Sequence, residues 1–322
     1  MTKTQQLVNE AFPELKPKFD VSLSSFTYFK IGGRAEILIE VKNSQELVKL
    51  VKFCREKNLS YHILGGASNV LISDEGLQGI VIRVMNEKEY DVVGQPDING
   101  KQLVRVGAGY KTALFVRKTV DDGFVGLEYF LGVPGTIGGA IYNNAHYLEH
   151  LIGEHVHAVE VLNTQNEIVW LPARECRFAY DFSRFHNSGE VILRVEFALA
   201  RGDKENSLEL IKTATILRAK TQPLGEPSSG CYFRNTPNTP KLQILFPQFA
   251  DRREVPAGFL IDQAGLKKKS VGGIQVSEKH AAFLVNTGSG TSTEVQELAN
   301  IVKERVKSKY GVELQEEVFW MK

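Results

Sequence analysis

The sequence has few of the features that mark secreted, membrane or nucleic-acid-binding proteins. Its 322 residues include only three cysteines, Cys54, Cys176 and Cys231, and no C-x-x-C pair. An odd and widely spaced set favours neither a disulfide framework nor a zinc site, so we expect reduced thiols and no metal. No run approaches the roughly 20 apolar residues that span a bilayer. The first residues lack a signal-peptide core, and a net charge of +1 favours neither nucleic acid nor acidic membranes.

The rest of the composition is that of an ordinary soluble protein, with 43% hydrophobic and 24% charged residues. The length allows two or three domains, and we expect a cytoplasmic protein that mixes α and β structure. Residues 43–58 predict a helix, because Asn43 and Glu46 fit a capping box. Four apolar residues of this segment fall on one helical face and predict a buried side: Leu47, Leu50, Val51 and Cys54.

A first glycine-rich segment lies between two predicted strands, "YHIL" (61–64) and "GIVIRV" (79–84). Glycine lets the backbone approach a ligand closely, and consecutive N–H groups in such a turn form an anion site. Small side chains make up the candidate loop: Gly65, Gly66, Ala67, Ser68 and Asn69. An ordinary tight turn is the alternative, because the third glycine and the following helix of the dinucleotide-binding fingerprint are missing.

A second glycine-rich segment follows a predicted strand, "QLVRVGAG" (102–109), and a predicted helix, "KTALFVRKTV" (111–120). Its loop "GVPGTIGGA" (132–140) holds too many small residues for a regular element. We interpret it as backbone pressed against a flat cofactor. With Gly126 it supplies the second set of predicted cofactor contacts: Gly132, Val133, Pro134, Gly135, Gly138 and Gly139.

Several blocks in a fixed order resemble the UDP-N-acetylenolpyruvoylglucosamine reductases, flavoenzymes of bacterial cell-wall (peptidoglycan) synthesis. The blocks are "FTYFKIGGRAEILIEV", "ILGGASNVLISDEGLQGIVIRV", "GLEYFLGVPGTIGGAIYNNA", "SSGCYFRN", "AGFLIDQAGL", "GGIQVSEKHAAFLVN" and "GVELQEEV". The resemblance implies an α+β fold. Two FAD-binding subdomains of the vanillyl-alcohol-oxidase (PCMH) type, residues 1–85 and 86–203, would precede an α+β domain for the UDP-sugar, residues 204–322.

The resemblance also implies an enzymatic reaction. NADPH would reduce FAD, and UDP-N-acetylglucosamine enolpyruvate would then receive hydride and a proton to give UDP-N-acetylmuramate. The family's usual proton donor is a serine, and Cys231 stands at its position. A thiol with a reference pKa of about 8.5 is a stronger acid than an aliphatic hydroxyl, so it can do the same work. A passive loop substitution is the alternative.

By resemblance, Glu317 is the carboxyl group that stabilises the enolate. Glu313, Gln315 and Glu317 would share one face if this segment were a strand. The preceding segment, residues 292–311, predicts a helix that begins with a Thr293 and Gln296 capping box and ends at Gly311.

The sequence departs from the family pattern at Asp181. The family has an arginine directly after the tyrosine of this block, and the block here reads "CRFAYDFSRF". An ionised aspartate does not stabilise an anion, so Arg184 is the predicted substitute and Arg177 the alternative. Cys176 is predicted to be a packing residue.

By resemblance, Lys220 and Asn235 are predicted to contact the uridine diphosphate of the substrate. Arg234 would contact the diphosphate or face solvent, and Tyr180 is a further predicted substrate contact. One of Lys267, Lys268 and Lys269 could contact phosphate, although such a run is more often a solvated loop. His155 and His157, expected to be strand neighbours, form too small a set for a metal.

Two other functions stay open. One is an FAD-dependent oxidase of the same fold with another substrate, and the other is a non-catalytic nucleotide-sugar-binding paralogue, which the departure at Asp181 would favour. The sequence also leaves open the choice between NADPH and NADH and the oligomeric state, for which we favour a monomer.

Overall fold

A computed structural model describes residues 1–86 and 88–322. The chain divides into two compact units, each considered by itself. Unit 1 contains residues 1–21, 35–66 and 78–218, and unit 2 contains residues 22–34, 67–77 and 219–322. Both units therefore draw on distant parts of the sequence. The three subdomain boundaries expected from the sequence stay a prediction.

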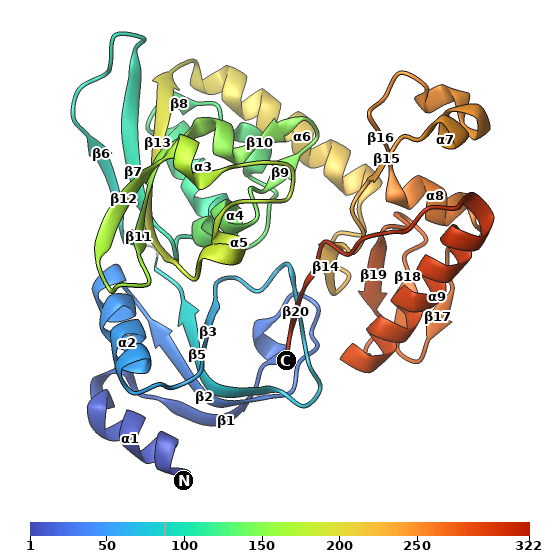
Figure 1. Cartoon of the computed structure of the whole chain (residues 1–322). Helices are drawn as coiled ribbons and strands as arrows, with labels where there is room; N and C mark the ends of the chain where they lie inside the picture. The colour runs from blue at the N-terminus through green and yellow to red at the C-terminus, as the bar shows by residue number, and fades with distance from the viewer. Residues whose placement is uncertain (87) are drawn as a thin grey trace. The chain divides into compact units, whose positions relative to one another are not determined.

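The first sheet of unit 1 has the strand order β1-β2-β5-β3, with β3 and β5 parallel. Helices α1 and α2 accompany this sheet (Figure 1). Helix α2 begins as predicted, because the Asn43 side chain accepts the Glu46 backbone N–H, and its predicted apolar face, Cys54 included, is buried. The elements are α1 (Lys3–Ala11), β1 (Lys18–Ser22), β2 (Arg34–Val41), α2 (Ser44–Glu56), β3 (Tyr61–Leu64) and β5 (Leu77–Val84).

The second sheet of unit 1 is antiparallel, with the strand order β12-β11-β13-β7-β6 and β8 also paired with β13. Its core includes residues of α3 and α4, and the two predicted elements at 102–109 and 111–120 are confirmed. The strands are β6 (Tyr90–Val93), β7 (Lys101–Gly107), β8 (Phe124–Val125), β11 (Val156–Leu162), β12 (Ile168–Pro172) and β13 (Val191–Arg201). The other elements are α3 (Thr112–Asp121), α4 (Ile137–Tyr142), β9 (His146–Tyr147), β10 (His150–Leu151), α5 (Phe185–Ser188) and α6 (Lys204–Thr221).

Unit 2 is built around a sheet of order β14-β19-β18-β17, with helices α8 and α9 in its core (Figure 1). Two small pairs, β15 with β16 and the parallel β4 with β20, complete it. The strands are β4 (Val70–Ile72), β14 (Ser228–Cys231), β15 (Thr236–Pro237), β16 (Glu254–Val255), β17 (Ser270–Val271), β18 (Ile274–Val276), β19 (Phe283–Asn286) and β20 (Phe319–Met321). The helices are α7 (Pro240–Leu245), α8 (Ala257–Gln263) and α9 (Ser292–Tyr310).

Helix α9 corrects one detail of the prediction. Its capping box is formed by Thr291 and Glu294, not by Thr293 and Gln296. Asp74 accepts hydrogen bonds from the backbone N–H and the hydroxyl of Thr293, which therefore lies inside the first turn. The predicted end at Gly311 is confirmed, with a left-handed φ of 76°.

Three further expectations are wrong in part. The loop 132–140 is not wholly irregular, because α4 begins at Ile137 and buries Ile137 and Ile141. Residues 313–317 do not form a regular strand and contain only an isolated bridge at Glu316. His155 ends a short 3-10 helix and His157 lies in β11, so they are not strand neighbours.

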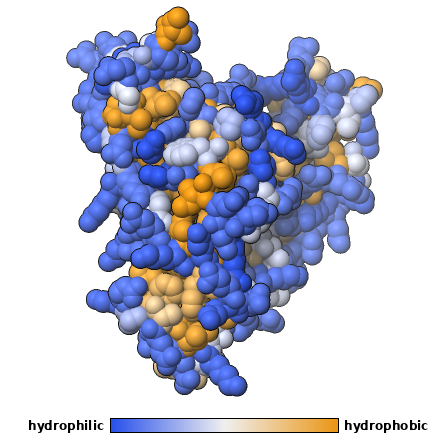
Figure 2. Space-filling model, turned by 60° about the vertical axis from the view of Figure 1, so that its left-hand side comes forward, coloured by the Kyte–Doolittle hydropathy of each residue, from blue (hydrophilic) through white to orange (hydrophobic). Residues whose placement is uncertain are grey.

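The visible surface in Figure 2 is mostly hydrophilic, with separate hydrophobic areas. The most exposed large hydrophobic side chains, Ile98 and Ile244, belong to different segments of the chain. Within the described part of the chain, every helix is too short or too polar to cross a bilayer.

Candidate active site

The two glycine-rich loops predicted to hold a cofactor contact each other in unit 1. A Cβ added at Gly66 would lie 2.4 Å from the Cα of Gly135, and one added at Gly65 would lie 2.4 Å from Thr136 Oγ1. Carbon atoms normally approach to about 3.5–4.0 Å, so only glycine permits this contact between the backbones. The tertiary fold therefore joins two segments that are far apart in the sequence into one surface of small residues.

Other glycines of the second loop have individual neighbours. A Cβ at Gly126 would meet the His155 ring at 3.0 Å, one at Gly132 would meet the Arg218 guanidinium at 2.8 Å, and one at Gly138 would meet the Ala108 Cβ at 2.9 Å. Gly139 differs, because its nearest neighbour would be Thr136 Oγ1 at 3.7 Å. Protein packing does not require glycine at 139, and its backbone can approach a ligand.

Asn69 ends the first loop and belongs to unit 2. Its side-chain Nδ2 donates to the Glu317 carbonyl oxygen at 3.3 Å, and its own carbonyl accepts the Phe319 N–H at 3.1 Å. Ala67 has a left-handed φ of 53°, and its carbonyl accepts the Tyr28 N–H at 3.1 Å. The end of the predicted cofactor loop is thus bound directly to the segment that carries Glu317.

Cys231 is the last residue of β14 and lies opposite Phe283 of β19. The strand is irregular here, because Gly230 has a φ of 83° and the register shifts between Ser228 and Cys231. Cys231 is only half-buried, whereas Cys54 and Cys176 are fully buried as predicted. Cys231 is therefore the least buried of the three cysteines.

The segment carrying Glu317 pairs with the segment that follows Cys231. The Glu317 N–H donates to the Tyr232 carbonyl and the Arg234 N–H donates to the Gln315 carbonyl, both at 2.9 Å. Phe233 and Glu316 form the antiparallel bridge between these bonds. Cys231 and Glu317 are therefore on neighbouring stretches of backbone within unit 2.

The three carboxylates near the C-terminus have different partners. Glu313 is exposed and pairs with Lys307 at 2.5 Å, and Glu316 pairs with Lys303 at 2.5 Å. Glu316 also hydrogen-bonds the Tyr232 side chain, whose pKa is raised by burial and by this carboxylate. Two of the carboxylates are thus bound to lysines of α9. The third residue, Glu317, is bound to Asn69 through its backbone carbonyl oxygen.

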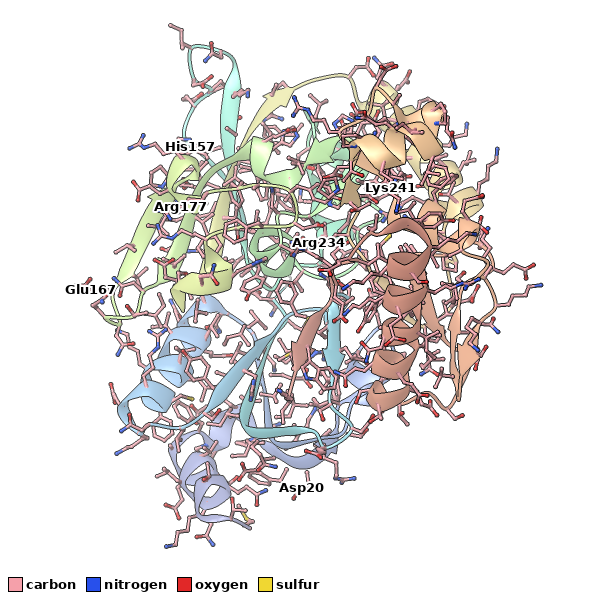
Figure 3. All side chains as sticks on the ribbon, turned by 45° about the vertical axis from the view of Figure 1, so that its right-hand side comes forward. Asp20, His157, Glu167, Arg177, Arg234 and Lys241 are labelled. Atoms are coloured by element: carbon pink, nitrogen blue, oxygen red, sulfur yellow. The ribbon has the colours of Figure 1, made fainter. Side chains whose placement is uncertain are left out.

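The predicted substrate contacts lie in both units. Asn235 accepts the Ala257 N–H through Oδ1 at 3.2 Å, at the start of α8. Arg234 is half-buried beside it, in the segment between β14 and β15, and is labelled in Figure 3. Lys220 is exposed near the end of α6. Tyr180 lies in unit 1 and contacts the ring of His146 at 4.5 Å.

The arginine candidates differ in their surroundings. The Arg184 guanidinium forms two contacts with the Glu190 carboxylate, both at 3.1 Å, and donates to the Glu175 carbonyl at 3.3 Å. Arg177 is exposed, in a left-handed conformation, and is labelled in Figure 3. Asp181 is fully buried and lies 3.1 Å from His146 Nδ1. The sequence does not mark His146 as a candidate, since a single histidine gives no local signal.

Two of the predicted lysine candidates form ion pairs with carboxylates of unit 2. Lys267 pairs with Asp262 and Lys268 with Glu278, both at 2.8 Å. Burial lowers the pKa of His155. The described residues contain no cluster of three potential metal ligands.

Comparisons with known proteins support the predicted fold. Residues 35–172 match the FAD binding domain model, and residues 222–321 match the C-terminal domain of UDP-N-acetylenolpyruvoylglucosamine reductase. The crystal structure of the Thermus caldophilus reductase superposes with a TM-score of 0.75 at 30% identity, covering 94% of this chain and 98% of that one. The α+β fold with an FAD-binding domain is thereby confirmed.

Relatives in sequence cover nearly the whole chain. The reductase of Chlamydia felis is 35% identical over 298 residues, 92% of each chain. The reductase of Clostridium beijerinckii is 31% identical over 315 residues, which are 98% of this chain and 96% of its own. The chain therefore belongs to the UDP-N-acetylenolpyruvoylglucosamine reductases, FAD-dependent oxidoreductases of peptidoglycan synthesis whose reductant is NADPH.

Proposed function

We propose that this chain reduces UDP-N-acetylglucosamine enolpyruvate to UDP-N-acetylmuramate in the cytoplasm, as a monomer, with NADPH as reductant. The observation that carries the proposal is the pairing of residues 232–234 with residues 315–317. It brings the segments of a thiol and a carboxyl group together in a chain of this family. A proton donor and a group that stabilises negative charge are what this reduction requires.

FAD fits the two joined loops of small residues. Backbone N–H groups of residues 65–69 and of Gly132, Gly135 and Gly139 would bind its diphosphate, because the N–H groups of Val133, Ile137 and Gly138 already donate to backbone carbonyls. Gly139 is the position whose glycine the protein's own packing does not explain. We assign Gly126 to the same site. When bound and reduced, FAD supplies a hydride to the outer carbon of the enol ether.

Residues of the chain stabilise and then protonate the negative charge that hydride addition creates on the substrate. As the new C–H bond forms, the electron pair of the double bond moves to the inner carbon and delocalises into the substrate carboxylate. The Cys231 thiol gives its proton to the inner carbon and becomes a thiolate, which solvent then reprotonates. Glu317, as a hydrogen-bonding carboxyl group, and Arg184 stabilise the enolate before the proton arrives.

The UDP-sugar is proposed to lie against four polar or aromatic side chains. Lys220 and Arg234 supply positive charge for the diphosphate, and Asn235 hydrogen-bonds the nucleotide. Tyr180 supplies an aromatic surface. These assignments follow from the family resemblance and from the half-buried or exposed state of each side chain.

The two half-reactions separate the role of Cys231 from that of FAD. Replacing Cys231 by Ala is expected to leave flavin reduction by NADPH nearly normal. Reoxidation by the enolpyruvyl sugar should slow by about two orders of magnitude or more, within the range that acid catalysis contributes. Cys231→Ser should keep much of the activity, because a hydroxyl restores a proton donor. If Cys231→Ala reoxidises at the native rate in a single turnover, Cys231 is not the proton donor and is only a loop residue.

Thiol labelling gives an independent measurement. Burial raises the pKa of both Cys54 and Cys176 to about 12, so their thiols stay protonated and unreactive in the folded protein. An alkylating reagent should modify one thiol per chain, inactivate the enzyme and be blocked by bound UDP-sugar. If the folded Cys231→Ser variant is labelled at the same rate as the unsubstituted protein, this assignment is wrong.

A further inference from the structure

A buried tyrosine links the two segments of the proposed active site in unit 2. Tyr232 follows Cys231 directly and is 1% exposed. Its side chain hydrogen-bonds the carboxylate of Glu316, which directly precedes Glu317. We propose that Tyr232 and Glu316 are positioning residues, which fix the proposed proton donor relative to the carboxyl group that stabilises the enolate. This inference rests on the proposed function and adds to it how the two groups are held.

The backbone pairing between the two segments is short. The bridge between Phe233 and Glu316 is isolated, and residues 313–317 form no regular strand. Two paired strands without further support are at best marginally stable in water. A side-chain hydrogen bond from one segment to the other therefore adds a link where the backbone pairing is short.

The core of unit 2 fixes the position of the tyrosine ring. The ring packs edge-on against Phe233 at a centroid distance of 5.1 Å, and both residues are fully buried. Side chains in a close-packed core have little freedom to rotate, so the Tyr232 hydroxyl is held in one place. Burial and the nearby Glu316 carboxylate raise the pKa of Tyr232, which keeps this hydroxyl protonated as a hydrogen-bond donor.

Lys303 holds the Glu316 carboxylate from helix α9. Its Nζ lies 2.5 Å from Glu316 Oε1, and the neighbouring helix residues Val302 and Val306 are fully buried. The two charged side chains are 33% and 31% exposed, so screening by solvent makes the ion pair weak as a source of stability. Its effect is to orient the carboxylate, which then accepts the hydrogen bond of Tyr232.

The backbone on the other side of Cys231 gives the thiol less support. Gly230 precedes it with a φ of 83°, at the register shift of β14. The residue after Cys231 is the better fixed one, because Tyr232 donates its N–H to the Ala282 carbonyl at 2.7 Å and accepts the Glu317 N–H at 2.9 Å. Proton transfer needs the donor within about 2.6–3.2 Å of its target, so the anchoring of Tyr232 should control the reaction rate.

A double-mutant cycle on the holoenzyme tests the inference. Tyr232→Phe removes only the hydroxyl, and Glu316→Ala removes its acceptor. Each should slow reoxidation of the reduced flavin by saturating UDP-N-acetylglucosamine enolpyruvate by about tenfold or more. The half-saturating concentration and flavin reduction by NADPH should change little, since substrate binding is kept.

The two single variants break the same bond, so their effects should not add. The double variant Tyr232→Phe/Glu316→Ala should be no slower than the slower single variant. Glu316→Gln keeps an oxygen that can accept the tyrosine hydrogen bond, and it should recover most of the reoxidation rate.

A second cycle separates positioning from stability. In Cys231→Ala no thiol remains to be positioned, so adding Tyr232→Phe should slow reoxidation by less than about twofold. The loss of melting temperature should be the same in both backgrounds. The matched control is Tyr310→Phe, which removes a hydroxyl from a buried ring at the end of α9 that packs against Phe246 at 5.5 Å. This control should leave the reoxidation rate unchanged.

The outcomes distinguish the two proposals. Native rates in folded Tyr232→Phe and Glu316→Ala, additive effects in their double variant, or an undiminished effect of Tyr232→Phe in Cys231→Ala overturn the positioning role and leave the proposed function intact. If Glu316→Ala does not retain FAD, Tyr232→Phe in the native and Cys231→Ala backgrounds still decides. A native holoenzyme whose reduced flavin the enolpyruvyl sugar does not reoxidise overturns the proposed function itself.

Discussion

Gly66 gives the sharpest test of the joined glycine loops. An alanine Cβ at this position would lie 2.4 Å from Gly135 Cα and 3.0 Å from Gly135 C. To restore a carbon–carbon distance of about 3.5 Å, the two backbones must separate by roughly 1 Å. The neighbour is backbone, not a side-chain end that could rotate away, so the strain of overpacking should appear in full, at about 1–3 kcal/mol.

Two measurements follow from this displacement. The melting temperature of flavin-free Gly66→Ala should fall by roughly 2–12 °C, taking ~2–4 °C per kcal/mol for a domain of about 150–250 residues. Its dissociation constant for FAD, measured by quenching of flavin fluorescence, should rise by about 10- to 100-fold. A shift of about 1 Å takes N–H donors out of hydrogen-bonding range of the diphosphate, and one charge-assisted bond is worth ~1.5–3 kcal/mol.

Gly139→Ala is the matched control in the second loop. Its Cβ would meet only Thr136 Oγ1, at 3.7 Å, and it lies in α4. The flavin-free protein should melt at the native temperature or slightly above, because alanine favours a helix over glycine by about 1 kcal/mol, while FAD affinity should fall. A native melting temperature in Gly66→Ala would refute the contact between the two loops. A native FAD affinity in Gly139→Ala would remove the second loop from the cofactor site.

Two further predictions concern the substrate half-reaction. Arg184→Ala should slow flavin reoxidation by about 100-fold, the effect of losing one oxyanion donor. Glu190→Gln keeps the arginine and should leave the reoxidation rate unchanged. If both variants lose equal stability and neither changes the rate, the ion pair of Arg184 and Glu190 is structural. Lys303→Met removes the ion-pair partner of Glu316, the neighbour of Glu317. Flavin reoxidation should slow by roughly tenfold or more, because a displacement of Glu317 by about 1 Å is enough for such an effect. Lys307→Met on the same helix is its control, since that ion pair is exposed, and equal rates in the two lysine variants would exclude the positioning role.

The sequence by itself determined the features that depend on neighbouring residues. Helix α2 follows from its apolar spacing and its Asn43 cap, and α9 ends where Gly311 permits a left-handed turn. The ordered blocks indicated the family without any structure. A local pattern fails where two nearby residues can perform the same task, as at the start of α9. Thr291 and Thr293 are each followed, three residues on, by a side chain that completes a capping box, and Asp74 decided between them.

Only the tertiary structure decided which distant segments meet. The contact between Gly66 and Gly135, the pairing of residues 232–234 with 315–317, and the pair of His146 and Asp181 join residues that no local periodicity relates. A lone histidine in a sequence carries no sign of a carboxylate partner 35 positions away, because hydrogen bonds depend on distance in space. The chemistry of the site could therefore be assigned to residue types from the sequence, while their partners depend on the packing of each unit.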